Sequence, residues 1–158
     1  SQKAYTLLKG DGTTPKEILT SVRRPSGGVG RALTHESELQ ISLRRWLGNH
    51  AVRTTADYDQ TAHGLWGIDW ESSATSAPAN IKTITVPLLV MVMTGHYFIQ
   101  SGELLIERSG SADKEMVGIE GATHGITPCE PCAQVKGQFG DTVKRTYDYL
   151  DGWLAKRF

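Results

Sequence analysis

One uninterrupted run of apolar residues constrains the fold more than any other feature of this sequence. Residues 88–93 read Leu-Leu-Val-Met-Val-Met and follow directly after Pro87. A strand with one solvated face alternates apolar and polar residues, whereas a strand covered on both faces is apolar throughout. The run therefore predicts a strand inside a parallel sheet. Even when it is counted from Val86, the run is much too short to span a bilayer, so no membrane span is expected.

The residues after this run complete a repeating pattern of strands and helices. We expect a turn over 94–98, a short helix over 102–109 and a second strand over 115–120. An amphipathic helix is expected over 142–156, with Asp141 as its N-cap. The apolar face of this last helix is expected to carry Val143, Tyr147, Leu150, Trp153 and Leu154. This order of elements predicts an α/β fold with parallel strands and right-handed connections.

The first half of the chain has a weaker pattern. Pro15 suits the first turn of a short helix ending at Leu19, and the glycine-rich segment 25–30 lacks the phosphate-binding motif and reads as a loop. Residues 34–50 have apolar residues at helical spacing, which predicts an amphipathic helix that either packs on the body or serves as a lid. Residues 51–80 contain no long element, apart from a brief strand near residues 51–55.

Composition and length set limits on what to expect of this chain. The 17 basic and 17 acidic residues cancel, so charge gives no reason to expect a nucleic-acid partner. A length of 158 residues is typical of one domain. The N-terminal residues do not form an apolar signal segment, and nothing in the sequence assigns a compartment. No cofactor is expected.

The two cysteines form the segment Cys129-Glu130-Pro131-Cys132. A zinc site usually needs two further ligands, and a thioredoxin-type motif lies between a strand and a helix. A local disulfide, or two unreactive thiols, is therefore the favoured interpretation. A metal site that adds His96 and His124 to the cysteines is a less favoured alternative, and redox activity is another.

A histidine follows each of the two predicted strands. His96 comes after Gly95, and His124 ends the segment Gly-Ala-Thr-His at 121–124. Functional side chains in parallel sheets gather where the strands end. Small residues beside His124 would leave its imidazole accessible, as a general base requires. The alternatives are a surface turn histidine at 124 and a backbone-bonded turn residue at 96.

The second half of the chain resembles the C-terminal part of an α/β-hydrolase. The matching segments are Ile-Thr-Val-Pro-Leu-Leu-Val at 84–90 leading to Gly95, Gly-Ala-Thr-His at 121–124, Phe-Gly-Asp-Thr at 139–142, and Trp-Leu at 153–154. The resemblance implies that residues 81–158 are the C-terminal part of the hydrolase core. It also implies that residues 1–80 form a helical and loop-rich cap.

Such a resemblance implies a carboxylesterase-like serine hydrolase, which cleaves an ester with a Ser-Asp/Glu-His triad. His124 would be the general base of that triad. No serine stands in a Gly-x-Ser-x-Gly segment, so the nucleophile is expected in the N-terminal half of the same enzyme, outside this chain. Glu103 is the nearest candidate for the acid, although it equally suits the first turn of a helix. Asp57 and Asp69 are weaker candidates, and an acid upstream of Ser1 is a further alternative.

The resemblance also implies a small apolar ester as the substrate. The side chains expected to bind it or to form cap surface are His96, Tyr97, Phe98, Trp46, Trp66 and Trp70. The alternative function is a non-catalytic binding module that pairs an exposed strand edge with another chain. In that case the chain would form a homo-oligomer and His124 would be dispensable.

Overall fold

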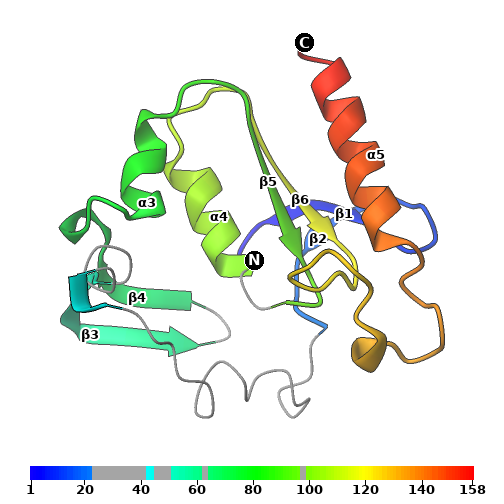
Figure 1. Ribbon diagram of the computed structural model, residues 1–158, viewed down its shortest axis with the longest axis horizontal. Coiled ribbons are helices and arrows are strands. Elements are labelled where there is room, and N and C mark those ends of the chain that lie inside the picture. The colour runs from blue at the N-terminus through cyan, green and yellow to red at the C-terminus, as the bar shows by residue number, and fades with distance from the viewer. Residues whose placement is uncertain (23–41, 45–50, 62–63, 97–98) are drawn as a thin grey trace.

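The computed structural model describes residues 1–22, 42–44, 51–61, 64–96 and 99–158. A four-stranded sheet in the order β2-β1-β6-β5 lies between α4 and α5, which cover its two faces (Figure 1). The main elements are β1 (Ala4–Leu8), β2 (Lys16–Ile18), β5 (Leu88–Met93), α4 (Ile99–Arg108), β6 (Lys114–Ile119) and α5 (Thr142–Ala155). Strands β1, β6 and β5 are parallel to one another, and β2 is antiparallel to β1. The predicted α/β class is confirmed at this level.

The predicted strand-helix-strand unit is confirmed, with shifted boundaries for the helix and the second strand. Strand β5 covers all six residues of the apolar run, and it pairs in parallel with β6 from Leu88 opposite Lys114 to Met93 opposite Ile119. Helix α4 connects the two strands and begins at Ile99, earlier than expected. None of the described helices has the length and apolar character that a membrane crossing requires.

Side-chain alternation along the strands divides the core into two clusters. Successive residues of a strand point to opposite faces of the sheet. The cluster on the α4 face contains Leu7, Leu19, Val92, Ile99, Ile106 and Met116, with Leu88 and Val90 packed against it. The cluster on the opposite face contains Leu8, Val117, Ile119 and Ala122, with Leu89, Met91, Met93 and Tyr149 packed against it. Strand β5 therefore contributes apolar side chains to both faces, as predicted.

Helix α5 begins as predicted but buries a different face. The Asp141 carboxylate accepts a hydrogen bond from the Lys144 N–H at 2.8 Å, which confirms it as the N-cap. Trp153 is buried, but Val143, Tyr147 and Leu154 of the expected apolar face are exposed. The sheet side holds Thr142 and Thr146 instead, whose hydroxyls donate to the carbonyls of Ile126 and Thr142. Burial of these threonines is tolerated because both hydroxyls are hydrogen-bonded.

The prediction of a short helix over residues 15–19 is wrong, because residues 16–18 form strand β2. The neighbouring strand β1 supplies an antiparallel partner, with Tyr5 opposite Glu17. The Leu7 N–H donates to the Pro15 carbonyl at 2.8 Å, which keeps the chain extended before β2. These strands belong to the expected cap region of residues 1–80, yet they lie in the same sheet as β5 and β6.

Residues 51–80 are more ordered than the sequence indicates. Strands β3 (Arg53–Thr61) and β4 (Gly64–Asp69) form a separate antiparallel hairpin (Figure 1). The hairpin is followed by the short helices η1 (Trp70–Ser72), α3 (Ala77–Asn80) and η2 (Ile81–Thr83). The brief strand expected near residues 51–55 is in part the start of β3, but the prediction of no long element was wrong. The helix expected over 34–50 falls outside the described residues, apart from residues 42–44.

Candidate functional site

His124 lies in a tight turn that begins at Thr123, four residues past the end of β6 at Ile119. The Thr123 N–H donates to the Thr127 carbonyl at 2.8 Å, and the Ile126 N–H donates to the Thr123 carbonyl at 2.9 Å. These two bonds enclose a loop of three residues, a common hairpin connection whose last residue has a positive φ. That residue is Ile126, with φ 58°. A β-branched residue in this conformation costs on the order of 1–3 kcal/mol, so the surrounding contacts must hold the turn in place.

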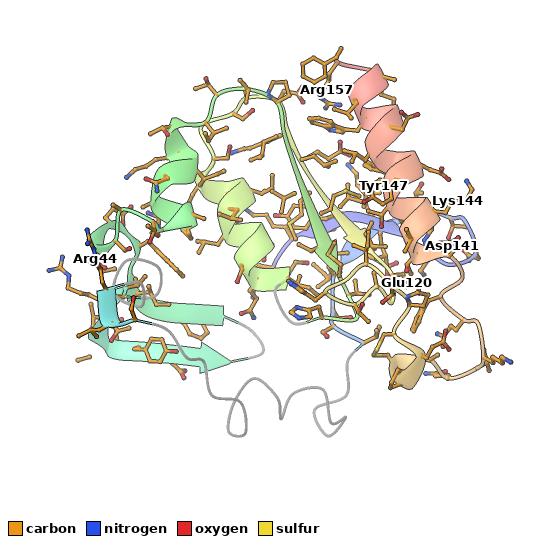
Figure 2. All side chains as sticks on the ribbon, in the orientation of Figure 1. Arg44, Glu120, Asp141, Lys144, Tyr147 and Arg157 are labelled. Carbon is orange, nitrogen blue, oxygen red and sulfur yellow. A yellow bond between two sulfur atoms is a disulfide. The ribbon has the colours of Figure 1, made fainter. Side chains whose placement is uncertain are left out.

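Helix α5 provides one of these contacts. The Thr142 hydroxyl donates to the Ile126 carbonyl at 2.5 Å, and Thr142 is completely buried. Figure 2 shows Asp141 and Lys144 at this same end of the helix. Two contacts fix the position of Thr142. The Asp141 side chain caps the helix that begins at Thr142, and the Thr142 hydroxyl is bonded to the turn. The turn that carries His124 is thereby attached to the start of α5.

The disulfide loop provides a second contact. Cys129 and Cys132 are bonded to each other, and both pack on Phe139. The Cys129 N–H donates to the Gly121 carbonyl at 2.8 Å. A Cβ at Gly121 would lie 2.0 Å from the Phe139 ring, so only glycine allows this packing. Of the two alternatives favoured from the sequence, a local disulfide or two unreactive thiols, the structure has the disulfide, and it supports the end of β6.

The metal alternative gains no support. Disulfide sulfurs are not thiolates, and thiolate is the form in which cysteine binds metals. In the described part of the chain, no group of three or more His, Cys, Asp and Glu side chains could hold a metal ion. The combination of His96, His124 and the two cysteines proposed as a metal-binding set therefore does not form.

The ends of β5 and β6 approach each other closely and bring two histidines together. A Cβ at Gly95 would lie 2.5 Å from the Ala122 carbonyl oxygen, and the Thr94 hydroxyl accepts from the Gly121 N–H at 2.8 Å. The imidazole centroids of His96 and His124 are 4.9 Å apart, with the rings tilted by 37°. The sequence placed both histidines at strand ends, and the fold makes them neighbours.

Both histidines line a cavity of about 440 Å³. The other lining residues are Val90, Met91, Val92, Met93, Ser101, Gly102 and Leu105. The His124 residue is exposed and His96 is half-buried. The site therefore combines a mostly apolar wall with two imidazoles at its end, an arrangement typical of pockets for small apolar ligands.

Glu103 has partners of a different kind. It is buried, and its carboxylate accepts from the Gln2 N–H at 2.9 and 2.7 Å and from the Lys3 N–H at 2.9 Å. Burial, together with this carboxylate, raises the pKa of Tyr5 to about 12. Through these contacts Glu103 fixes the start of β1. Its role as the acid of a triad stays a prediction, and no contact among the described residues supports it.

Most of the other residues predicted for the site lie elsewhere. Trp66 belongs to β4 and is 47 % exposed. Asp57 bonds to Thr55 on the same hairpin, and Asp69 forms an ion pair with Arg53 at 3.0 Å. Trp70 begins η1. Trp46, Tyr97 and Phe98 fall outside the described residues.

Sequence reasoning missed two residues that position the site. Thr142 stands in the Phe-Gly-Asp-Thr segment, but nothing in that segment indicates a hydrogen bond to the turn of His124. Thr94 follows the apolar run, and its buried hydroxyl joins the ends of β5 and β6. The only available signal was a small hydroxyl residue at an element boundary, where threonine frequently bonds to backbone.

The fold and the site define an α/β protein with a mixed sheet and a histidine-lined apolar cavity at the carboxyl ends of its parallel strands. In comparisons with protein-family models, curated proteins and solved structures, the chain matches none of them.

Proposed function

We propose that this chain supplies the general base of a serine hydrolase that cleaves small apolar esters. In this proposal His124 takes the proton of a serine hydroxyl as the serine attacks the ester carbonyl. The imidazolium then returns the proton to the leaving alcohol. The serine and the donors that stabilise the oxyanion belong to a polypeptide segment outside residues 1–158.

The main support is the placement of one accessible imidazole. His124 stands on a turn held by Thr142, at the end of a parallel strand, and faces an apolar cavity of about 440 Å³. A general base must be held firmly while its ring remains reachable, and this turn provides both conditions. His96, with its ring 4.9 Å away, would border the substrate or help to orient the base.

The test is replacement of His124 in the native protein, purified with everything that binds it. We expect His124→Ala to lower kcat/KM for p-nitrophenyl butyrate about 10²–10⁴-fold, because general-base assistance is lost. Glu130→Gln is the matched control, since Glu130 is also exposed and lies on the adjoining loop. Unchanged turnover in His124→Ala would refute the role of this histidine.

The pH dependence gives a second measurement on the same samples. Because a general base accepts a proton only in its neutral form, activity should be lost as the solution is acidified and the base becomes protonated. A rate that does not fall with decreasing pH would point to a different base. The native protein should also contain a Gly-x-Ser-x-Gly segment, and its absence would contradict a serine mechanism.

A further inference from the structure

A second cavity lies between the C-terminal half of α5 and the start of β6. Its volume is about 300 Å³, at the lower end of the roughly 300–1,000 Å³ that is typical of ligand pockets. None of its lining residues also lines the cavity of His96 and His124, and His124 lies past the opposite end of β6. The second cavity therefore suits a small molecule that binds apart from the two histidines.

Four charged side chains line this cavity, and two of them are already held in ion pairs. Asp148 is paired with Lys144 one turn earlier on α5. The Arg157 guanidinium donates two hydrogen bonds to the Asp113 carboxylate, each 2.7 Å long. Figure 2 shows Lys144 and Arg157 toward opposite ends of the helix. Neither Asp148 nor Arg157 therefore needs a ligand to balance its charge.

The other two charged side chains, Glu115 and Lys156, form no ion pair with any described residue. Glu115 is half-buried on β6, and its carboxylate accepts a hydrogen bond from the Tyr149 hydroxyl at 2.5 Å. Lys156 follows the last turn of α5 and is exposed. A partly buried carboxylate is stabilised when a cation pairs with it. The cavity thus offers one anionic and one cationic group to the same ligand.

Trp153 gives the cavity an aromatic wall and a donor without an acceptor. The residue is 7 % exposed, and the Arg157 guanidinium lies 4.0 Å from the centroid of its ring. Its indole N–H is buried and has no hydrogen-bond partner among the described residues. A buried donor of this kind is unfavourable unless an acceptor reaches it. The adjoining cavity is the space through which a ligand can bring one.

Gly152 keeps this space open. Glycine weakens the interior of a helix, and packing does not require it here, because no atom lies within 4 Å of a Cβ built at this position. Since Gly152 lines the cavity, a larger side chain would occupy part of it. The glycine is therefore explained by the cavity and not by a neighbouring side chain.

We infer that this cavity binds a free α-amino acid with an apolar side chain. The ammonium group of the ligand pairs with Glu115 and its carboxylate pairs with Lys156. The apolar side chain packs against the Trp153 ring. A ligand with only one of the two charges would leave either Glu115 or Lys156 without a partner. This inference does not depend on the proposed function.

Isothermal titration calorimetry of the native protein tests the ligand class. L-Leucine and L-phenylalanine are the probes, and 4-methylpentanoate and 3-methylbutylamine are leucine analogues that lack the ammonium or the carboxylate. We expect saturable binding of at least one amino acid. Each analogue should bind at least about tenfold more weakly than leucine, because one charge-assisted contact is lost. If neither amino acid binds, or if an analogue binds as tightly as leucine, the inference is overturned.

Substitutions locate the bound amino acid. Glu115→Gln removes the charge but keeps an acceptor for Tyr149, and Lys156→Gln removes the cation. Each should weaken binding at least about tenfold, and Gly152→Leu should abolish it by filling the cavity. Lys136→Gln, on an exposed loop, is the matched control and should leave the affinity unchanged. Unchanged affinity in Lys156→Gln would overturn the inference, and because Lys156 is exposed this variant is expected to fold even if Glu115→Gln does not.

One further variant separates this inference from the proposed function. His124→Ala should bind the amino acid with the affinity of the wild type, because the two cavities share no lining residue. Loss of amino-acid binding in His124→Ala would place the ligand beside the histidines and overturn the inference. Failure of the wild type to hydrolyse esters would refute the proposed function alone.

Discussion

The two edges of the sheet differ in strand length, charge and apolar character. Strand β2 is three residues long and includes Lys16 and Glu17, and Glu17 forms an ion pair with Lys9 at 3.3 Å. Strand β5 is six residues long, uncharged and apolar. Short, charged edge strands are a common protection against unwanted pairing. The β2 edge therefore has the character of an outer boundary, whereas the β5 edge has the character of an internal strand.

The β2 edge is also attached firmly to the rest of the molecule. The Ser1 hydroxyl accepts a hydrogen bond from the Leu19 N–H at 2.8 Å. The Leu19 side chain is 1 % exposed and packs against Gly118 of β6. The contrast shows that a strand can lie at the edge of a sheet without the short, charged sequence that protects an edge from pairing.

The largest expected effect is the loss of the β2 anchor. Leu19→Ala should lower the free energy of unfolding by about 2–5 kcal/mol, because it removes a fully buried side chain and leaves a cavity. The control is Ile18→Ala, since Ile18 is 49 % exposed, and a surface change of this kind alters stability by about 0.5 kcal/mol. Urea denaturation would compare the two, and equal effects would show that β2 is not anchored through Leu19.

A smaller effect is expected at the start of β1. Glu103→Gln should destabilise the fold by about 1–3 kcal/mol, because a buried carboxylate that accepts backbone N–H bonds loses charge and one acceptor oxygen. Glu107→Gln on the exposed side of the same helix should cost much less, although Glu107 pairs with Lys3 at 2.5 Å. If urea denaturation gave both variants the same stability, Glu103 would not be needed to fix this strand.

The smallest effect is expected at Asp113, which lies just before β6 and next to the start of β5. Hydrogen bonds from Arg157 lower the pKa of the Asp113 carboxyl below its ordinary value of 3.8. A lowered pKa in the folded state adds stability above pH 3.8, and this contribution disappears as pH falls through the lower value. Urea midpoints of wild type and Asp113→Asn should therefore differ at pH 7, and the difference should shrink as the pH is lowered below 3.8. Asp151→Asn, a change at an exposed acid on α5, is the control and should leave the midpoint at pH 7 almost unchanged.

The elements predicted correctly are those whose local sequence determines their structure with little help from distant contacts. Strand β5 is a continuous apolar run, and α5 has an N-cap that the sequence shows directly. Strand β2 was assigned to a helix because three residues after a proline carry little local preference, and its partner β1 decided the outcome. The β3–β4 hairpin was missed because Arg53–Tyr58 is exposed throughout, so no apolar alternation marks it.

The candidate site shows the same division. The strand-helix-strand pattern alone was enough to place His96 and His124 together at the carboxyl ends of the parallel strands. Their close approach depends on Gly95 and Thr94, whose contacts at the ends of β5 and β6 have no sequence signature. The cavity could not be predicted, because it is bounded by the edge of β5, which no described strand covers, and its existence depends on which strands are neighbours.

The hydrogen bond between Thr142 and Ile126 has a consequence for how this chain tolerates changes in length. A helix turns by about 100° for each residue, so one residue inserted between Thr142 and Thr146 would rotate the Thr142 hydroxyl away from the turn while Trp153 kept its place. Insertions in the exposed loop 134–138 would leave that relation unchanged. The start of α5 thus sets the position of His124. Natural variants of this protein should therefore differ in the length of this loop but not in the spacing from Thr142 to Trp153.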